Sequence, residues 1–174
     1  AYSVTHTARE YSYSVEKRQT VNDSMFVQTI KKDTDVVLSV SAPEIFEADL
    51  IDAPSWGCVN VHTSDLPKYR GILPTFWALY HDESEIVITV HTMVEEIDRG
   101  EILAQTAFDV DRSMSLDDVI LKGKRYGGEL AAQTLEAIDS DNVEPSPMNG
   151  DDSYFSFPTR SERREFQERG WSLL

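Results

Sequence analysis

The chain has 174 residues, of which 40% are hydrophobic and 27% charged, a composition typical of a soluble globular protein of about one domain. Its net charge of −15 repels the phosphates of a duplex or a tRNA, and no segment approaches the ~20 apolar residues of a membrane span. Nucleic acid and membranes are therefore not expected as partners. The acidic residues are spread along the chain, which predicts a solvated surface, a feature also found in proteins adapted to high salt.

The single cysteine, Cys58, excludes an intrachain disulfide framework and suits a reducing cytoplasm, so we expect a cytoplasmic protein. Cys58 is either a nucleophile or a small buried strand residue, and the second reading is favoured.

The first part of the chain predicts four elements. Alternating Tyr and Val residues within 1–21 favour edge strands or a hairpin. Residues 22–24, Asn-Asp-Ser, form a helix cap, and an amphipathic helix is expected to follow through Lys32. The near-continuous β-branched run 36–41 predicts a strand covered on both faces in a parallel sheet. A short helix is expected at 44–51.

The stretch 57–71, GCVNVHTSDLPKYRG, begins as a strand whose side chains alternate between two faces. Asn60 and His62 therefore leave one face, ~6.6 Å apart from twice the rise per residue. A buried polar group without a partner costs about 1–3 kcal/mol, so two such residues indicate a site or a satisfied structural contact. Because Ser-Asp-Leu-Pro ends the strand at once, both lie near its carboxyl end, where ligands bind in open α/β sheets.

The later elements are a helix starting at Pro74, strands at 86–94 and 101–110, and a long helix opened by Ser115. His91 is expected to be a hydrogen-bonded strand histidine and not a ligand. Between the two strands, an acidic turn places the carboxylate of Asp98 beside Gly100.

The long helix carries two glycines on its apolar stripe, Gly123 and Gly127, and these predict a close approach to the sheet. We expect one domain over 1–150 and a docked tail over 151–174 with a short charged helix.

Three separated elements carry a resemblance. The pattern Asn60-x-His62, then Leu66-Pro67-x-x-x-Gly71, then Ile97-Asp98-x-Gly100-x-Ile102 resembles the 10-formyltetrahydrofolate-dependent formyltransferases. That family includes methionyl-tRNA formyltransferase, glycinamide ribonucleotide transformylase and the sugar N-formyltransferases. The resemblance implies an α/β fold with a Rossmann-like, mostly parallel sheet flanked by helices. It also implies a short amino-terminal half, because only about 35 residues precede the strand at 36–41, which is either a trimmed region or one partly absent from the sequence.

The resemblance also implies a transferase of one-carbon metabolism with 10-formyltetrahydrofolate as co-substrate and no metal. Its catalytic residues would be Asn60, His62 and Asp98. Because the chain is acidic, any phosphate that it binds must meet a local basic patch, and Lys68 and Arg70 beside the expected site are the candidates. With Gly71 they are the expected substrate-binding residues. The departure from the family's usual Ser-Leu-Leu-Pro at Asp65 is expected to affect loop packing or acceptor choice. The folate would contact two segments, comprising Ser41, Ala42, Pro43, Ile45 and Phe46 in the first and Val94, Glu95, Glu96 and Ile97 in the second.

The expected partners are a small-molecule formyl donor and an amine acceptor, such as an amino-sugar nucleotide or glycinamide ribonucleotide, and a homodimer is left open. One alternative is a catalytically silent folate- or nucleotide-binding module. Another is a metal-dependent hydrolase whose ligands would be His62, His81 or His91 together with Asp65, Asp82 or Asp98. The spacings of the histidines match no compact metal motif.

Overall fold

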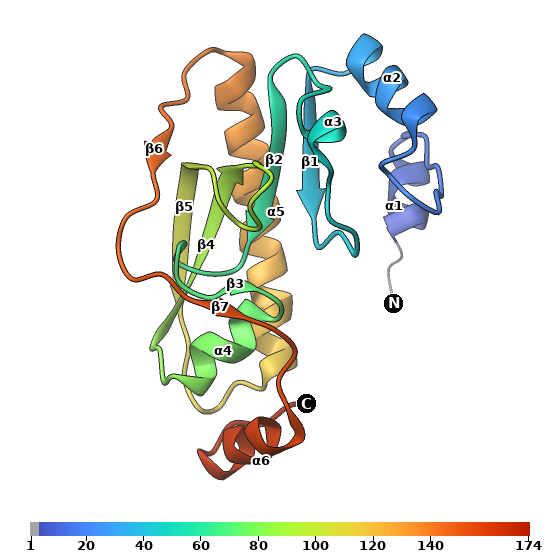
Figure 1. Ribbon diagram of the computed structural model, residues 1–174. Helices are drawn as coiled ribbons and strands as arrows, with labels where there is room; N and C mark the ends of the chain where they lie inside the picture. The colour runs from blue at the N-terminus through green and yellow to red at the C-terminus, as the bar shows by residue number, and fades with distance from the viewer. Residues whose placement is uncertain (1–3) are drawn as a thin grey trace.

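The architecture is known from a computed structural model, which describes residues 4–174. A five-stranded sheet forms the centre, with helices packed around it (Figure 1). The helices are α1 (Val4–Glu10), α2 (Ser24–Asp33), α3 (Ala48–Ile51), α4 (Pro74–Tyr80), α5 (Leu116–Asp139) and α6 (Arg160–Glu168). The strands are β1 (Val36–Val40), β2 (Gly57–His62), β3 (Arg70–Gly71), β4 (Glu85–Thr92), β5 (Glu101–Asp109), β6 (Ser146–Pro147) and β7 (Tyr154–Phe155).

The strand order in the main sheet is β1-β2-β4-β5-β6, and a separate ribbon pairs β3 with β7. The predicted α/β class with flanking helices is confirmed. The pairing is more mixed than the sequence predicts, because β1 and β2 are parallel whereas the β2·β4, β4·β5 and β5·β6 pairs are antiparallel. Residues 93–100 alone join β4 to β5, and a parallel crossover needs roughly a dozen residues or more. That connection therefore forces an antiparallel pair.

The long helix α5 packs along the sheet as its glycines predict (Figure 1). A Cβ added at Gly127 would lie 3.1 Å from Val61 Cγ1, and one added at Gly123 would lie 3.2 Å from Thr63 Cγ2. The close approach brings the helix onto β2, the strand that carries Asn60 and His62. A capping box between Ser115 and Asp118 starts the helix, which also agrees with the sequence.

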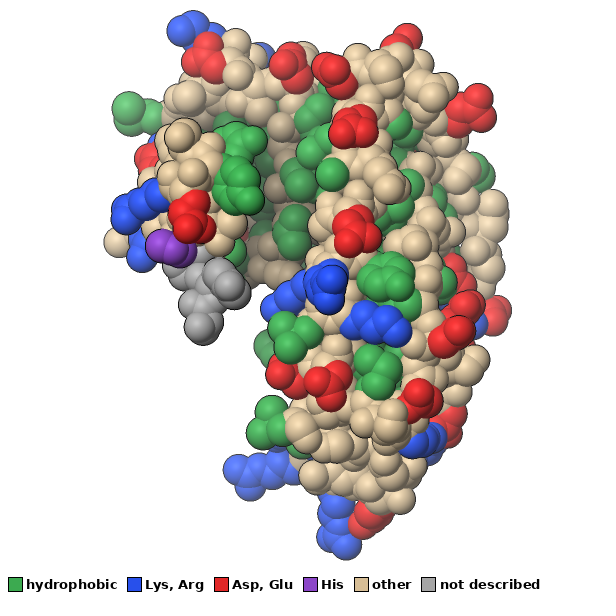
Figure 2. All heavy atoms as spheres, turned by 180° about the vertical axis from the view of Figure 1, so that it is seen from behind, with side chains coloured by type: hydrophobic (Ala, Val, Ile, Leu, Met, Phe, Trp, Pro, Cys, Tyr) green, Lys and Arg blue, Asp and Glu red, His purple; other side chains and the backbone are tan. Residues whose placement is uncertain are grey.

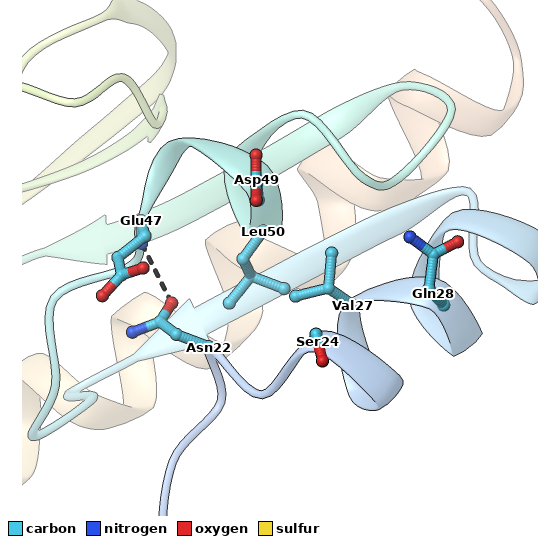
Figure 3. Close-up of a pocket in the computed structure, with 7 residues that line it drawn as sticks. All are labelled: Asn22, Ser24, Val27, Gln28, Glu47, Asp49 and Leu50. Carbon is cyan, nitrogen blue, oxygen red and sulfur yellow. Dashed lines mark hydrogen bonds between the residues drawn. The ribbon is translucent and has the colours of Figure 1, made fainter.

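A second cluster of buried residues joins α2 and α3 to the edge strand β1 and its neighbour β2. It contains Val27, Leu50, Ile51 and Cys58. A cavity of about 80 Å³ lies where α2 meets α3, and there the Asn22 side-chain oxygen accepts a 3.0 Å hydrogen bond from the Glu47 amide (Figure 3). These contacts fix the loop between β1 and α3, which reaches the large cavity described below.

Two predictions for the first part of the chain are wrong. Residues 4–10 form α1, and the described part of 1–21 contains no strand, because local bonds such as Tyr13 N to Ala8 O satisfy the backbone instead. The remaining residues of that predicted segment, 1–3, lie outside the described part. β1 is not covered on both faces, since Val40 is 56% exposed. It is the last strand on its side of the sheet, and an apolar run does not show how many faces are covered.

The surface agrees with the charge distribution expected from the sequence. Acidic side chains are scattered over the face seen from behind and do not form one block (Figure 2). On the same face, a hollow with apolar side chains in its walls lies beside the segment that carries the amino terminus (Figure 2). Within residues 4–174, no helix is both long enough and apolar enough to cross a bilayer.

The glycines of α5 allow a matched test of the close approach. Gly128→Ala should stabilise the protein by up to ~1 kcal/mol, because Gly lowers helix propensity and a Cβ there meets nothing within 4 Å. Gly123→Ala and Gly127→Ala should gain less or lose stability, because overpacking typically costs ~1–3 kcal/mol. Urea unfolding of the three variants gives the comparison, and equal gains at all three positions would contradict close packing of α5 on β2.

Candidate active site

A cavity of about 830 Å³ opens beside the carboxyl end of β2. Its walls include the three predicted catalytic residues Asn60, His62 and Asp98. All of the residues predicted to contact the folate also line it, and these are Ser41, Ala42, Pro43, Ile45, Phe46, Val94, Glu95, Glu96 and Ile97. The fold thus brings together two segments that were predicted separately, the loop after β1 and the turn after β4.

His62 is held from both sides of its ring. It is 7% exposed, and its Nε2 lies 3.0 Å from the carbonyl oxygen of Tyr69. Since a carbonyl only accepts, Nε2 carries a hydrogen and donates it there. Nδ1 faces the Asp98 carboxylate at 3.5 Å. The ring is therefore oriented by two chain segments that lie outside its own strand.

Asp98 occupies a turn with a backbone conformation that few non-glycine residues adopt. Its φ is 51°, in the left-handed region, and its side chain is 13% exposed. One carboxylate oxygen faces His62, and the other accepts a 2.7 Å hydrogen bond from the backbone N–H of Gly71. The carboxylate thus bridges the strand that carries His62 and the loop that follows it.

Asn60 is oriented by a residue that sequence reasoning did not connect to it. Its Nδ2 donates to His91 Nε2 at 3.2 Å, and the pairing of β2 with β4 sets Asn60 directly opposite His91. His91 Nδ1 donates to the carbonyls of Thr92, at 2.8 Å, and Arg99, at 3.1 Å. His91 Nε2 therefore carries no hydrogen and accepts one from the Asn60 amide, which orients that amide. The second amide hydrogen of Asn60 is not used in this contact. The expectation that His91 is a hydrogen-bonded strand histidine agrees with these contacts.

Burial determines the protonation state of His91, which is 1% exposed. Desolvation lowers the pKa of its imidazole below the ordinary value, and the bonds to the two carbonyls oppose that shift without cancelling it. His91 therefore remains neutral at pH 7 and can accept the Asn60 amide hydrogen. Burial likewise raises the pKa of the Cys58 thiol to about 11, so Cys58 is protonated and does not act as a nucleophile.

The three residues predicted to meet the acceptor lie differently. Gly71 lines the cavity and holds Asp98. Lys68 is outside its walls and lies 3.7 Å from Glu83. Arg70 is also outside the walls and pairs with Asp152. Contact of Lys68 and Arg70 with an acceptor phosphate stays a prediction, and it requires these ion pairs to open.

The tail contributes to the cavity, which sequence reasoning missed. β7 runs parallel to β3, and Tyr154 and Phe157 line the cavity while 51% and 68% exposed. Ile72 N donates to Phe155 O at 2.8 Å, so the ribbon is continuous with the loop that carries Gly71. The sequence signal for this contact was the pair of aromatic residues at 154–155, beside a Ser-Phe-Pro stretch. Their partner strand β3 is only two residues long, so the sequence showed no pattern for it. Within residues 4–174, no three His, Cys, Asp or Glu residues gather as a metal site requires.

Comparison with known proteins adds to this geometry. The model of the formyl transferase family matches residues 1–135. The chain belongs to the formyl transferase family. It is 31% identical over 147 residues to a methionyl-tRNA formyltransferase from Pelobacter propionicus, which covers 84% of this chain and 46% of that protein. A methionyl-tRNA formyltransferase from Lysinibacillus sphaericus is 36% identical over 111 residues, or 64% of this chain and 36% of the relative. The chain spans about half or less of the length of these curated relatives.

Solved structures of the family share its fold. An N-formyltransferase from Helicobacter canadensis, in complex with folinic acid and dTDP-3-aminofucose, superposes with a TM-score of 0.73 at 20% identity, covering 97% of this chain and 64% of that one. A phosphoribosylglycinamide formyltransferase from Bacillus halodurans gives a TM-score of 0.68 at 22% identity, over 78% of this chain and 74% of that one. At these identities the likeness establishes the fold alone.

The burial of His91, which lowers the pKa of its imidazole, gives the protein a pH-dependent stability. Because the folded state lowers the pKa of His91, unfolding takes up a proton below the unfolded pKa of ~6.5, and the free energy of unfolding should fall as the pH drops from there toward the lower pKa of the folded state. His91→Gln should flatten that part of the profile, whereas His81→Gln should retain it. Urea unfolding across this pH range makes the comparison, and a profile unchanged by His91→Gln would refute the assignment.

Proposed function

We propose that the chain transfers a formyl group from 10-formyltetrahydrofolate to an amine. The observation that carries this proposal is the convergence of Asn60, His62 and Asp98 in one cavity, with each side chain fixed by contacts outside its own segment. The amine attacks the formyl carbon, and negative charge then grows on the formyl oxygen. The bond between the formyl carbon and the folate nitrogen breaks next, and the departing folate nitrogen takes up the proton that the attacking amine loses. Fixed donors at that oxygen stabilise the transition state more than the ground state.

Asn60 is the donor best prepared for this task. One of its amide hydrogens is committed to His91, so the amide plane is set before any substrate binds. The second hydrogen lies on a side chain that lines the cavity. We infer that it is donated to the formyl oxygen. Preorganisation of this kind avoids a rearrangement cost in the transition state.

His62 and Asp98 have the second role. The His62 Nε2 hydrogen is donated to Tyr69 O, and a formyl oxygen that replaced this carbonyl as acceptor would receive it. Asp98 faces the opposite nitrogen and lines the cavity, and we infer that it carries a proton from the attacking amine, directly or through a water. Since the same carboxylate also accepts from Gly71 N, movement of this loop would affect proton transfer and ring orientation together.

Two walls of the cavity suit two substrates. Ile45, at 63% exposed, and Val94, at 45%, belong to the wall predicted to meet the folate ring. Tyr154 and Phe157 belong to the β3·β7 side, together with Ile72 and Leu73, which are also partly exposed. Apolar side chains left in solvent within a cavity indicate a ligand surface. We infer that the second wall contacts the acceptor.

The charges favour a small acceptor with few phosphates. Of the basic residues that line the cavity, Arg99 is paired with Glu96 and Asp152. Within residues 4–174, Lys124 is a lining cation that takes part in no ion pair. A small amine with an aromatic or apolar body and one anionic group matches these features. An amino-sugar nucleotide, like the ligand in the Helicobacter canadensis structure, is a small amine with an aromatic base. A tRNA meets neither the charge nor the size.

Asn60→Ala and Asp98→Ala should each lower kcat by about 10²–10³-fold or more, because a fixed donor or its proton carrier is lost. Binding of the folate donor, followed by titration calorimetry, should remain nearly unchanged, and formylated product is measured by mass spectrometry over a panel of amines.

Asn149→Ala removes an exposed amide that does not line this cavity, and it should behave as the unaltered protein does. Full turnover in both site variants would refute the proposal. Folate binding with no product from any amine would instead identify a catalytically silent binding module.

Substitutions in the two walls should raise KM for different substrates. Phe157→Ala and Tyr154→Ala should raise KM for the acceptor roughly tenfold or more, from the ~1.5–3 kcal/mol gained by burying a large apolar side chain, while KM for the donor stays the same. Ile45→Ala should raise KM for the donor instead. Steady-state kinetics with each substrate varied in turn decide the matter, and a donor effect from Phe157→Ala would reverse the assignment of the walls.

A further inference from the structure

The guanidinium of Arg70 connects three separate segments around Asp98. Its Nη1 donates to the carbonyl oxygen of Ile97 at 2.9 Å, and its Nε donates to Asp152 Oδ1 at 2.9 Å. Glu96 lies 3.5 Å from the same Nη1. The Arg70 side chain is only 12% exposed, so its donors are occupied by these groups and are largely withdrawn from solvent.

The position of Arg70 in the chain gives these contacts their meaning. Ile97 directly precedes Asp98, and Gly71, whose N–H donates to the Asp98 carboxylate, directly follows Arg70. The side chain of Arg70 therefore holds the carbonyl before Asp98 while the next peptide holds its carboxylate. A non-glycine residue keeps a left-handed conformation only where its surroundings impose it. Here one hydrogen bond fixes the backbone before Asp98 and the other fixes its side chain.

We propose that Arg70 is a positioning residue for Asp98 and acts through these contacts instead of binding an acceptor phosphate. The inference rests on the proposed function, and it assigns Asp152 of the tail as the group that orients the arginine. A planar guanidinium provides parallel donors in a fixed geometry, which the compact ammonium of lysine lacks. The role therefore requires arginine and is not met by positive charge alone.

Asp152 is itself fixed by several contacts. Arg99 forms a second ion pair with it, and the neighbouring Ser153 accepts hydrogen bonds from Arg70 N, at 2.9 Å, and Tyr69 N, at 2.8 Å. The hydrogen bond from Arg70 lowers the pKa of the Asp152 carboxyl below its ordinary value, so the carboxylate stays charged at neutral pH. The tail segment 152–155 thus completes the support of Asp98.

The chain offers a matched control for Arg70. Arg169 also pairs with two carboxylates, Glu165 and Asp82, and donates to a backbone carbonyl, that of Tyr80 at 3.1 Å. These partners do not line the cavity. Arg169→Ala therefore removes the same kinds of bond without touching the support of Asp98.

The test compares Arg70→Ala, Arg70→Lys, Asp152→Asn and Arg169→Ala in the full chain. Because a misplacement of about 1 Å at a reacting group can cost 10²-fold, Arg70→Ala should lower kcat by roughly 10- to 100-fold with KM for both substrates within about twofold. Arg70→Lys should recover little of the loss. Asp152→Asn should give a smaller loss of the same kind, and Arg169→Ala should keep kcat even if its melting temperature falls.

A second readout does not depend on turnover. Hydrogen exchange of the Gly71 amide, followed by NMR, should speed up in Arg70→Ala and Asp152→Asn but not in Arg169→Ala. Unchanged Gly71 exchange with full kcat in Arg70→Ala would overturn the proposal, as would an effect on acceptor KM alone, which would mark Arg70 as a phosphate contact. If the unaltered protein transfers no formyl group, the proposed function fails, while the exchange measurement still decides the positioning role.

Discussion

The carboxylate of Asp98 is the point on which the site depends. One oxygen orients the His62 ring and the other accepts the Gly71 amide hydrogen, so a single side chain joins β2, the loop that follows β2, and the turn between β4 and β5. At 13% exposure it keeps some access to the cavity while solvent screens its contacts only in part. Asp98 is held in a left-handed backbone conformation, which is unfavourable for a non-glycine residue and which orients this carboxylate. Backbone strain of this kind is common at functional sites.

The sheet fixes the other half of the site through strand register. An antiparallel pair sets Asn60 opposite His91, and the bond between them exists only in that register. Burial keeps His91 neutral, which makes Nε2 an acceptor and leaves one amide hydrogen of Asn60 for another partner. Helix α5 packs closely against β2, because two of its residues that face the strand are glycines and have no side chain to separate the two elements. Packing, register and protonation thus act together on one amide.

Much of this site could be predicted from local pattern. The period of two placed Asn60 and His62 on one face, the glycines of α5 indicated close packing, and the resemblance supplied Asp98. What the sequence did not reveal depends on contacts between distant segments. The hydrogen bond of His91 to Asn60 needs the β2·β4 register, and the approach of Tyr154 to the cavity needs a ribbon of two short strands. The exposure of β1 likewise depends on which elements cover it, and a run of apolar residues does not encode that.

Under the proposed function, the electrostatic field restricts the choice of acceptor, which family membership does not. Relatives named methionyl-tRNA formyltransferases share up to 36% identity among those compared, yet a chain with a charge of −15 repels a polyanion at long range. Near the cavity, Arg70 and Arg99 are already neutralised by Asp152 and Glu96, so they add little attraction for phosphates. Salt screens the long-range term beyond ~8 Å but leaves these close pairs in place. Under that proposal the choice of acceptor depends on short-range contacts, and we infer that the wall containing Tyr154 and Phe157 favours an apolar or aromatic body over a chain of phosphates.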